Sequence, residues 1–107
     1  MQRYGQMVRA KPGCLQEYKR LHTAVPEGVL AMIRACHIRN YSIYEKDGVL
    51  FSCFEYHGDD FEADMARMAA DPATQAWWDV CKPLLDPLPS RQPGEFWAAM
   101  QEVFHCE

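Results

Sequence analysis

The chain has 107 residues, of which 49% are hydrophobic and 12% aromatic, so it can form one small domain with a real core. Its formal net charge is −4 and it contains no basic run, which argues against nucleic acid and against anionic membranes as partners. No apolar stretch approaches the roughly 20 residues of a membrane span, and the first residues lack the apolar region of a signal peptide. We therefore expect a single domain over residues 1–107 of a cytoplasmic protein with no membrane partner.

The cysteines are odd in number, and no two are spaced as Cys-x-x-Cys. Zinc sites need paired ligands at short spacing, and a disulfide framework in a small secreted domain needs an even count. We interpret these residues as reduced, small core side chains and expect no metal site. They are Cys14, Cys36, Cys53, Cys81 and Cys106.

The first helix is predicted after a short strand at residues 4–8 and a turn at residues 11–14 that contains Pro and Gly. Tyr18 and His22 are four residues apart in this helix, so they lie on the same face. Histidine is the side chain that most readily gives or takes a proton near neutral pH. The spacing fits the wall of a catalytic pocket, and it fits equally a boundary tyrosine beside a surface histidine.

The middle of the chain predicts a helix followed by a β-hairpin. Pro26 interrupts the first helix and suits the start of a second one. Residues 38–44 are rich in β-branched and aromatic side chains, as a strand requires. Asp47-Gly48 is a strong hairpin signal, and residues 49–56 form the returning strand.

A second helical region follows, and it is also divided by a proline. Residues 58–60 offer a cap for its first helix, while Asp71 and Pro72 suit the N-cap and first position of the next. Trp77 and Trp78 are neighbours on that helix and point about 100° apart. One can pack in the core, and the other is then available for an interface or as an aromatic platform for a ligand.

The end of the chain combines a proline-rich loop with a last strand. Residues 83–94 hold four prolines and no periodicity, which is typical of a long ordered loop that is functional or wraps a partner. Residues 97–105 alternate as a strand. The predicted order is βαββαβ, which makes the chain an α+β protein of the ferredoxin-like type. Its sheet would have one bare apolar face, so we expect a homodimer that closes an α/β barrel.

Several short motifs, in this order and at this chain length, resemble the L-rhamnose mutarotase family of small dimeric α/β barrels. Each motif is weak alone, but together they cover nearly the whole chain. They are Tyr18-x-x-x-His22, Pro26-Glu27, Asn40-Tyr41-Ser42-Ile43-Tyr44, Trp77-Trp78 and Glu102-Val103-Phe104.

The resemblance implies an enzyme that interconverts the α and β anomers of a 6-deoxy-L-hexose, a monosaccharide, without cofactor or metal. It implies that His22 is the proton donor and that Tyr18, Tyr41, Trp77 and Trp78 bind the sugar. The chemistry suits these residue types. Ring opening needs a proton delivered to the ring oxygen and another removed from the anomeric hydroxyl, and a positioned acid–base group accelerates such steps about 10²–10⁴-fold.

Two departures from the family pattern concern the choice of sugar. Val25 stands where a tryptophan is common, and residues 86–91 differ from the Asn-Pro-Asp-Asn-Ser-Pro-like run of rhamnose enzymes. The loop with Pro87-Leu88-Pro89 and residues 94–97 looks more like the L-fucose branch, so we expect L-fucose slightly ahead of L-rhamnose. Two other functions fit the same fold: a haem- or quinone-handling monooxygenase, and a non-enzymatic dimer that binds a small ligand.

Overall fold

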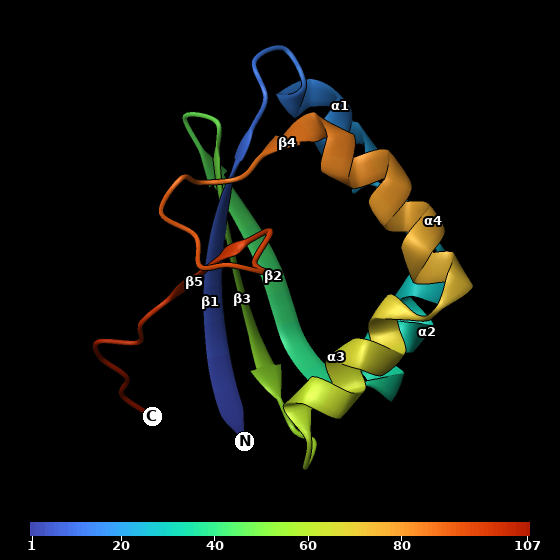
Figure 1. Cartoon of the computed structure of the whole chain (residues 1–107), viewed down its shortest axis with the longest axis vertical. Helices are drawn as coiled ribbons and strands as arrows, with labels where there is room; N and C mark the ends of the chain where they lie inside the picture. The colour runs from blue at the N-terminus through green and yellow to red at the C-terminus, as the bar shows by residue number, and fades with distance from the viewer.

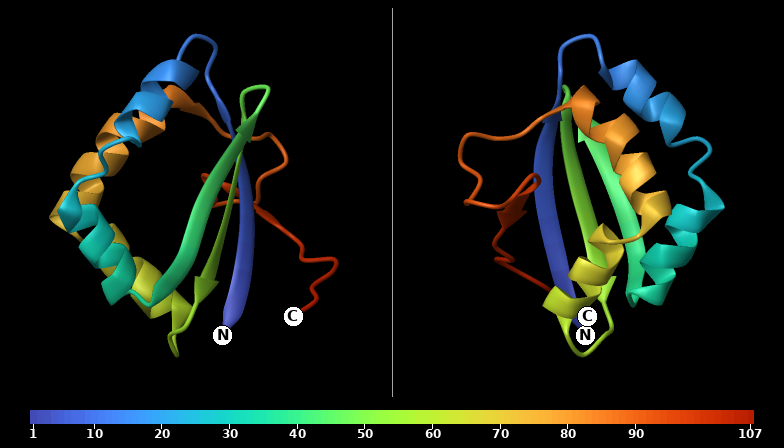
Figure 2. Two further views of the ribbon diagram at one scale, coloured as in Figure 1. Left: turned by 180° about the vertical axis from the view of Figure 1, so that it is seen from behind. Right: turned by 45° about the vertical axis from the view of Figure 1, so that its right-hand side comes forward.

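The computed structural model describes all 107 residues, as a curved antiparallel sheet with every helix on one side of it (Figure 1). The two further views show the same two layers, with both chain termini at one end of the sheet (Figure 2). No helix is long and apolar enough to cross a membrane. The elements in chain order are β1 (Gln2–Ala10), α1 (Leu15–Leu21), α2 (Glu27–Ala35), β2 (Ile38–Lys46), β3 (Val49–Tyr56), α3 (Phe61–Ala69), α4 (Pro72–Cys81), a 3₁₀ turn (Lys82–Leu84), β4 (Leu85–Asp86) and β5 (Ala98–Met100).

The sheet has the strand order β2-β3-β1, with β4 and β5 both along the remaining edge of β1. The predicted hairpin between β2 and β3 is confirmed. Its turn residues Asp47 and Gly48 have φ angles of 54° and 82°, the left-handed values that a tight two-residue hairpin needs. The predicted α+β class and ferredoxin-like layering are therefore confirmed.

The predicted helix breaks also occur, each with a physical cause in the sequence. The Asp60 carboxylate accepts a hydrogen bond from the backbone N–H of Ala63 (3.1 Å) at the start of α3. Asp71 does the same for Thr74 (3.0 Å), directly before Pro72 at the first turn of α4. Pro26 is the N-cap of α2, one position earlier than the sequence predicted.

The predicted last strand over residues 97–105 is wrong in its extent. β5 covers only Ala98–Met100, and residues 101–107 form no regular structure. The side chains of Val103 and Phe104 are 88% and 81% exposed. The edge of β1 continues at residues 2–4 beside the tail, where the Arg3 side chain pairs with Glu102 (3.2 Å), but the backbone ladder stops at Met100. The predicted loop is also partly regular, because the 3₁₀ turn and β4 lie within it.

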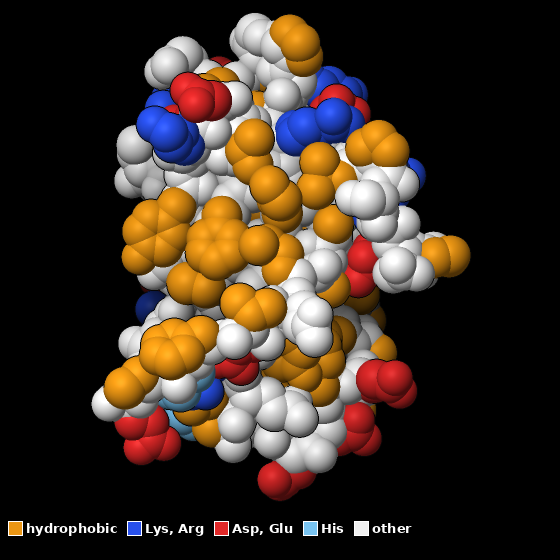
Figure 3. Space-filling view, turned by 90° about the vertical axis from the view of Figure 1, so that its left-hand side faces the viewer, with side chains coloured by type: hydrophobic (Ala, Val, Ile, Leu, Met, Phe, Trp, Pro, Cys, Tyr) orange, Lys and Arg blue, Asp and Glu red, His pale blue; other side chains and the backbone are white.

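The sheet face that points away from the helices is apolar over its centre (Figure 3). Tyr44 and Phe51 stack on this face with ring centroids 6.4 Å apart, and Phe51 lies opposite Met7 in the strand register. Met100 adds an exposed side chain beside Gly5 on β1. No element of this chain covers the patch, which confirms the prediction of a bare apolar face.

The core between sheet and helices consists of two clusters of buried side chains. We call them the α1 cluster and the α3 cluster after the helices that contribute to them. Trp77 packs against the first and Trp78 against the second, so both are half-buried and neither is left for an outside surface. The α1 cluster is Val8, Tyr18, Leu50, Cys81 and Leu85, and the α3 cluster is Cys36, Ile38, Phe54, Tyr56 and Met68.

All five cysteines are free. Their predicted role as core side chains holds for Cys36 and Cys81, which are buried. It does not hold for Cys106, which lies exposed in the C-terminal tail.

Candidate functional site

Helix α1 places Tyr18 and His22 in direct contact, as their spacing predicts. The two rings are 4.2 Å apart between centroids. His22 Nδ1 lies 2.8 Å from the backbone carbonyl oxygen of Tyr18. A carbonyl oxygen can only accept, so Nδ1 carries the proton and donates it. The other ring nitrogen, Nε2, makes no hydrogen bond to the protein and is free to exchange a proton with a ligand.

Trp77 joins this pair from helix α4. Its indole meets the His22 ring edge-on, with centroids 5.0 Å apart, and it packs on the same cluster that buries Tyr18. Three of the predicted site residues therefore come together from two helices that are far apart in the sequence.

A pocket of about 240 Å³ opens beside these residues, between α1 and the hairpin. An ion pair joins Lys19 Nζ to Glu45 Oε1 (2.9 Å) across its rim, which fixes α1 to β2. The volume is below the range typical of drug-sized ligand sites. The pocket is lined by Tyr18, Lys19, His22, Ile43, Tyr44, Glu45 and Leu50.

Tyr41 reaches the inner face of the sheet through a β-bulge in β2. The register between β2 and β3 shifts between Arg39 and Ser42, so Asn40 and Tyr41 together oppose the single residue Phe54. Asn40 has φ 51°, a left-handed value that asparagine tolerates better than most residues. Bulges of this kind re-aim a side chain. Here the Tyr41 ring is turned toward Phe54, 5.5 Å away between centroids.

Tyr41 lies close enough to Tyr18 to influence its pKa. Burial raises the pKa of Tyr41 to about 12, with a smaller contribution from the Cys81 thiol. Burial also raises the pKa of Tyr18 far above its ordinary value, with Tyr41 and Cys81 adding to the effect. Tyr41 is nonetheless 42% exposed. The side chain is therefore open to solvent over part of its surface, while burial still affects its hydroxyl. Both phenols stay protonated at neutral pH, and neither hydrogen bonds to the protein.

Trp78 lies apart from the histidine, on the α3 cluster. The ammonium of Lys82 sits 4.5 Å above its ring and 5.1 Å from that of Phe96. Such cation–π contacts stabilise by about 0.5–2 kcal/mol and hold the indole in place. The sequence prediction missed Lys82, although its position four residues after Trp78 on a helix is the signal for such a contact.

Two polar residues on the inner face of the sheet were also missed. Ser52 is 1% exposed and lies between Leu50 and Phe54 in the inward register of β3. Gln6 lies directly opposite Ser52 on β1. The signal was present in the sequence, because both residues interrupt an otherwise apolar inward series.

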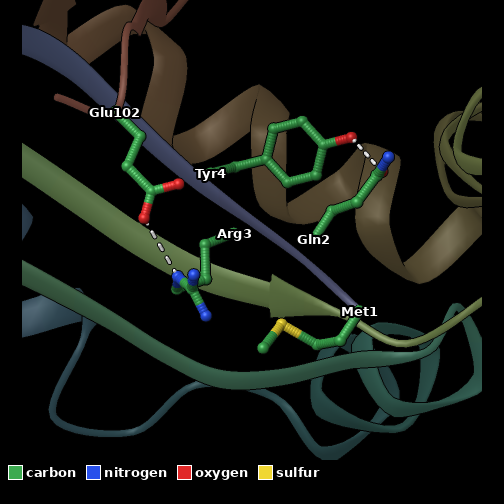
Figure 4. A pocket seen from close by; sticks show the side chains of 5 residues that line it. All are labelled: Met1, Gln2, Arg3, Tyr4 and Glu102. Carbon is green, nitrogen blue, oxygen red and sulfur yellow. Dashed lines mark hydrogen bonds and ion pairs between the residues drawn. The ribbon is translucent and has the colours of Figure 1, made fainter. Parts of the chain in front are cut away.

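A second hollow of about 390 Å³ lies at the N-terminus (Figure 4). It is larger, but its polar groups already have partners. Arg3 pairs with Glu102 (3.2 Å), and the Tyr4 hydroxyl donates to Gln2 Oε1 (2.7 Å). It contains none of the predicted site residues, so the pocket beside His22 is the better candidate. No group of three or more His, Cys, Asp or Glu side chains could hold a metal ion.

Comparison with known proteins decides the family. Residues 3–106 match the family model described as L-rhamnose mutarotase. The chain belongs to the L-rhamnose mutarotase family. Among its curated relatives, the L-rhamnose mutarotase of Phocaeicola vulgatus is 32% identical over 99 residues, which cover 91% of this chain and 90% of that protein. The Mesorhizobium japonicum enzyme of the same name is 25% identical over 109 residues, covering 97% and 96%. The resemblance seen in the sequence is confirmed, and membership of this family implies an isomerase-type enzyme.

Solved structures confirm the fold of the family. The L-rhamnose mutarotase of Formosa agariphila superposes with a TM-score of 0.78 at 21% identity, over the whole of both chains. Tetracenomycin F2 cyclase from Streptomyces glaucescens superposes with a TM-score of 0.74 at 10% identity, over all of this chain and 98% of that one. These likenesses establish the ferredoxin-like α/β fold of dimeric α/β barrels. The cyclase shows that a different chemistry uses the same scaffold.

Proposed function

We propose that this protein interconverts the α and β anomers of a 6-deoxy-L-hexose, with L-rhamnose as the first candidate and L-fucose as the second. The observation that carries the proposal is His22, held by Tyr18 and Trp77 with Nε2 unpaired at the edge of a pocket. Support for L-rhamnose comes from the relatives, which carry the name of L-rhamnose mutarotase. The loop at residues 86–91 is the sequence feature that keeps L-fucose in the comparison.

Proton transfer at His22 Nε2 accounts for the reaction. In its protonated form the imidazole gives its Nε2 proton to the ring oxygen O5, the C1–O5 bond breaks, and the anomeric hydroxyl passes its proton to solvent water, which leaves a C1 aldehyde and a neutral imidazole. The aldehyde then rotates, and the O5 hydroxyl closes on the other face of C1 with the reverse proton movements. No atom is gained or lost, so the imidazole need only be able to give and take a proton near pH 7.

The remaining site residues bind and orient the sugar. Because both phenols are neutral, Tyr18 and Tyr41 can each donate to one sugar oxygen and accept from another hydroxyl. The indole rings of Trp77 and Trp78 offer flat apolar surfaces to the C–H face and the C6 methyl group of a deoxysugar. The two tryptophans lie on different clusters, so they border the sugar space at two points rather than forming one stacked platform.

Anomer-exchange NMR tests the proposal. Saturation transfer between the anomeric protons should speed up on adding enzyme for L-rhamnose or L-fucose, and far less for D-glucose. The variant His22→Ala should lose most of this acceleration, by roughly 10²-fold or more. Acceleration confined to D-glucose, or none with any aldose, would overturn it. Family membership favours this reaction over the monooxygenase and the non-enzymatic binder, and a coloured purified protein would point back to the former.

We also propose that the working form is a homodimer. The apolar sheet face around Phe51 and the exposed tail residues Val103 and Phe104 support this, because a second copy would cover both. Removing residues 95–107 should give an insoluble or monomeric, inactive product, since β5 is lost from the edge of β1. Removing only residues 101–107 should keep the fold and shift the dimer toward monomer on light scattering. A soluble, stable dimer from the longer deletion would contradict the proposal.

A further inference from the structure

On the inner face of the sheet, two polar residues lie between the α1 cluster and the α3 cluster. On β1, Tyr4 packs on the α3 cluster and Val8 belongs to the α1 cluster, so Gln6 between them faces the same inner side. On β3, Ser52 holds the same intermediate position between Leu50 and Phe54. The sheet therefore presents two adjacent polar side chains where its apolar core is interrupted.

Neither side chain has a partner in the protein. The Ser52 hydroxyl is fully buried and is the one buried side-chain polar atom that makes no hydrogen bond. Buried polar groups are nearly always paired, and an orphan needs an explanation such as a bound molecule. The strand register sets Gln6 opposite Ser52, and Ile43 on the other side of Ser52 is apolar. Gln6 is only half-buried, and its amide also lacks a protein partner.

We propose that Gln6 and Ser52 form the polar floor of the sugar site and select among sugars that differ in hydroxyl direction. This inference rests on the proposed mutarotase function. Across the inner space, α4 presents the tryptophans, so a ring lying between them and the sheet would meet an apolar layer and a polar one. A serine hydroxyl and a carboxamide can each both donate and accept, as sugar hydroxyls can.

The approach of the sugar requires Gln6 to move. The Ser52 hydroxyl is closed off from solvent in the free protein, and the flexible Gln6 side chain is the polar neighbour that can turn aside. A sugar hydroxyl then takes the place of the missing partner. The unpaired Ser52 hydroxyl lowers the stability of the free protein, and a hydrogen bond to the bound sugar removes this cost.

Two variants test this proposal. Ser52→Ala removes one oxygen and keeps the packing, so the free protein should melt at the same temperature or higher, while KM for the preferred sugar rises about tenfold with kcat little changed. Gln6→Met keeps the length of the side chain and should also raise KM. Ser42→Ala, on the neighbouring strand but in register with the outward-facing Cys53, is the matched control and should leave KM unchanged.

The ratio of KM between L-rhamnose and L-fucose separates a specific role from a general one. These sugars differ in hydroxyl direction at C2 and C4, so Ser52→Ala or Gln6→Met should bring their KM values closer together. If both variants keep the wild-type KM and the wild-type ratio, the floor assignment is wrong although the enzyme remains a mutarotase. If the wild type accelerates no sugar and quenching of its tryptophan fluorescence detects no sugar binding, the proposed function fails first and the floor assignment fails with it.

Discussion

The two core clusters treat their polar groups in opposite ways. In the α3 cluster, the Tyr56 hydroxyl donates to Asp64 Oδ2 (2.5 Å) and accepts from the backbone N–H of Asp60 (3.0 Å). The same carboxylate oxygen also pairs with His37 Nδ1 (3.1 Å). The Tyr56, Asp64 and His37 side chains are thus paired with one another, and this network ties the end of the sheet to α3.

The α1 cluster and its border leave polar groups unpaired. The Tyr18 hydroxyl of the α1 cluster has no protein partner, nor has His22 Nε2 beside it, nor the hydroxyl of Tyr41, whose ring lies against Phe54. The orphan hydroxyl of Ser52 lies at the border between the clusters. An unpaired buried hydroxyl such as that of Ser52 lowers stability, and Tyr18 and His22, whose polar atoms also lack partners, line the pocket, so these groups point to binding rather than folding. The paired groups of the α3 cluster stabilise the fold, whereas the unpaired groups at the α1 cluster and its border are available to bind a ligand.

The largest effect should follow from removing His22, the proposed proton-transfer residue beside the α1 cluster. His22→Ala should lower anomer exchange by roughly 10²-fold or more, because a positioned acid–base group contributes about that much. Its melting temperature should change little, since the ring lies at the edge of the core and makes one backbone hydrogen bond. NMR saturation transfer and thermal melting measure the two quantities on one sample.

The matched control is His57→Ala, because His57 is a surface residue that pairs only with Glu55 (3.0 Å). It should keep wild-type exchange. An exchange rate for His22→Ala equal to that of this control would remove His22 from the mechanism.

The next effect concerns which sugar binds at the site beside His22. A misplaced hydroxyl leaves polar groups unpaired at about 1–3 kcal/mol each, and roughly 1.4 kcal/mol is a factor of ten. The preference between L-rhamnose and L-fucose should therefore be about tenfold or more. Exchange rates at equal sugar concentration measure it. Equal rates would show that neither the loop at residues 86–91 nor the sheet floor sets specificity.

A substitution in the hydrogen-bonded network of the α3 cluster should lower the stability of the protein without changing its activity. Tyr56→Phe removes the hydroxyl that joins Asp64 to the start of α3, so the melting temperature at pH 7 should fall by several degrees. Exchange measured well below the melting temperature should stay at the wild-type rate. A large loss of activity in a folded Tyr56→Phe protein would contradict the assignment of the α3 cluster to stability alone.

The pH dependence of this variant has a definite sign. The hydrogen bond from Tyr56, and then His37, holds the pKa of Asp64 below its usual 3.8. A lowered folded pKa gives stability that is present above the unfolded pKa and lost as the pH falls through the folded value. Burial raises the pKa of Tyr56 to about 12, so this residue stays neutral throughout. The difference in melting temperature between wild type and Tyr56→Phe should therefore be full above about pH 5 and shrink below about pH 4.

The fold was predictable from the sequence where local chemistry decides it. The Asp47-Gly48 turn, the Asp60 and Asp71 caps and the apolar series of β3 each act within a few residues, and the structure follows them. The extent of the last strand was not predictable in this way. Residues 101–105 alternate like a strand and continue along the edge of β1, but alternation within the segment does not determine how far the backbone ladder extends.

The site was predictable in part, for a similar reason. Tyr18 and His22 meet because a helix fixes residues four apart, and that spacing is visible in the sequence. Ser52 and Gln6 meet only because β1 and β3 pair in one particular register. The division of the core, which sends Trp77 and Trp78 to different clusters, likewise depends on how α4 packs across the sheet.

The smallest effect should come from the bulge that turns Tyr41 toward Phe54 on the inner face of the sheet. Asn40→Ala places alanine at φ 51°, where a residue without a hydrogen-bonding side chain is strained, and removes the hydrogen bond from Asn40 Nδ2 to Glu55 Oε1 (3.0 Å). We expect the bulge to relax, the Tyr41 hydroxyl to shift, and KM to rise a few-fold with kcat nearly constant.

Asn40→Gly is the matched control, because glycine accepts the left-handed conformation without strain but also lacks the side chain. If it keeps the wild-type KM while Asn40→Ala does not, the backbone conformation positions Tyr41. If both raise KM equally, the hydrogen bond to Glu55 does so, and if neither changes it, Tyr41 does not contact the sugar through this bulge.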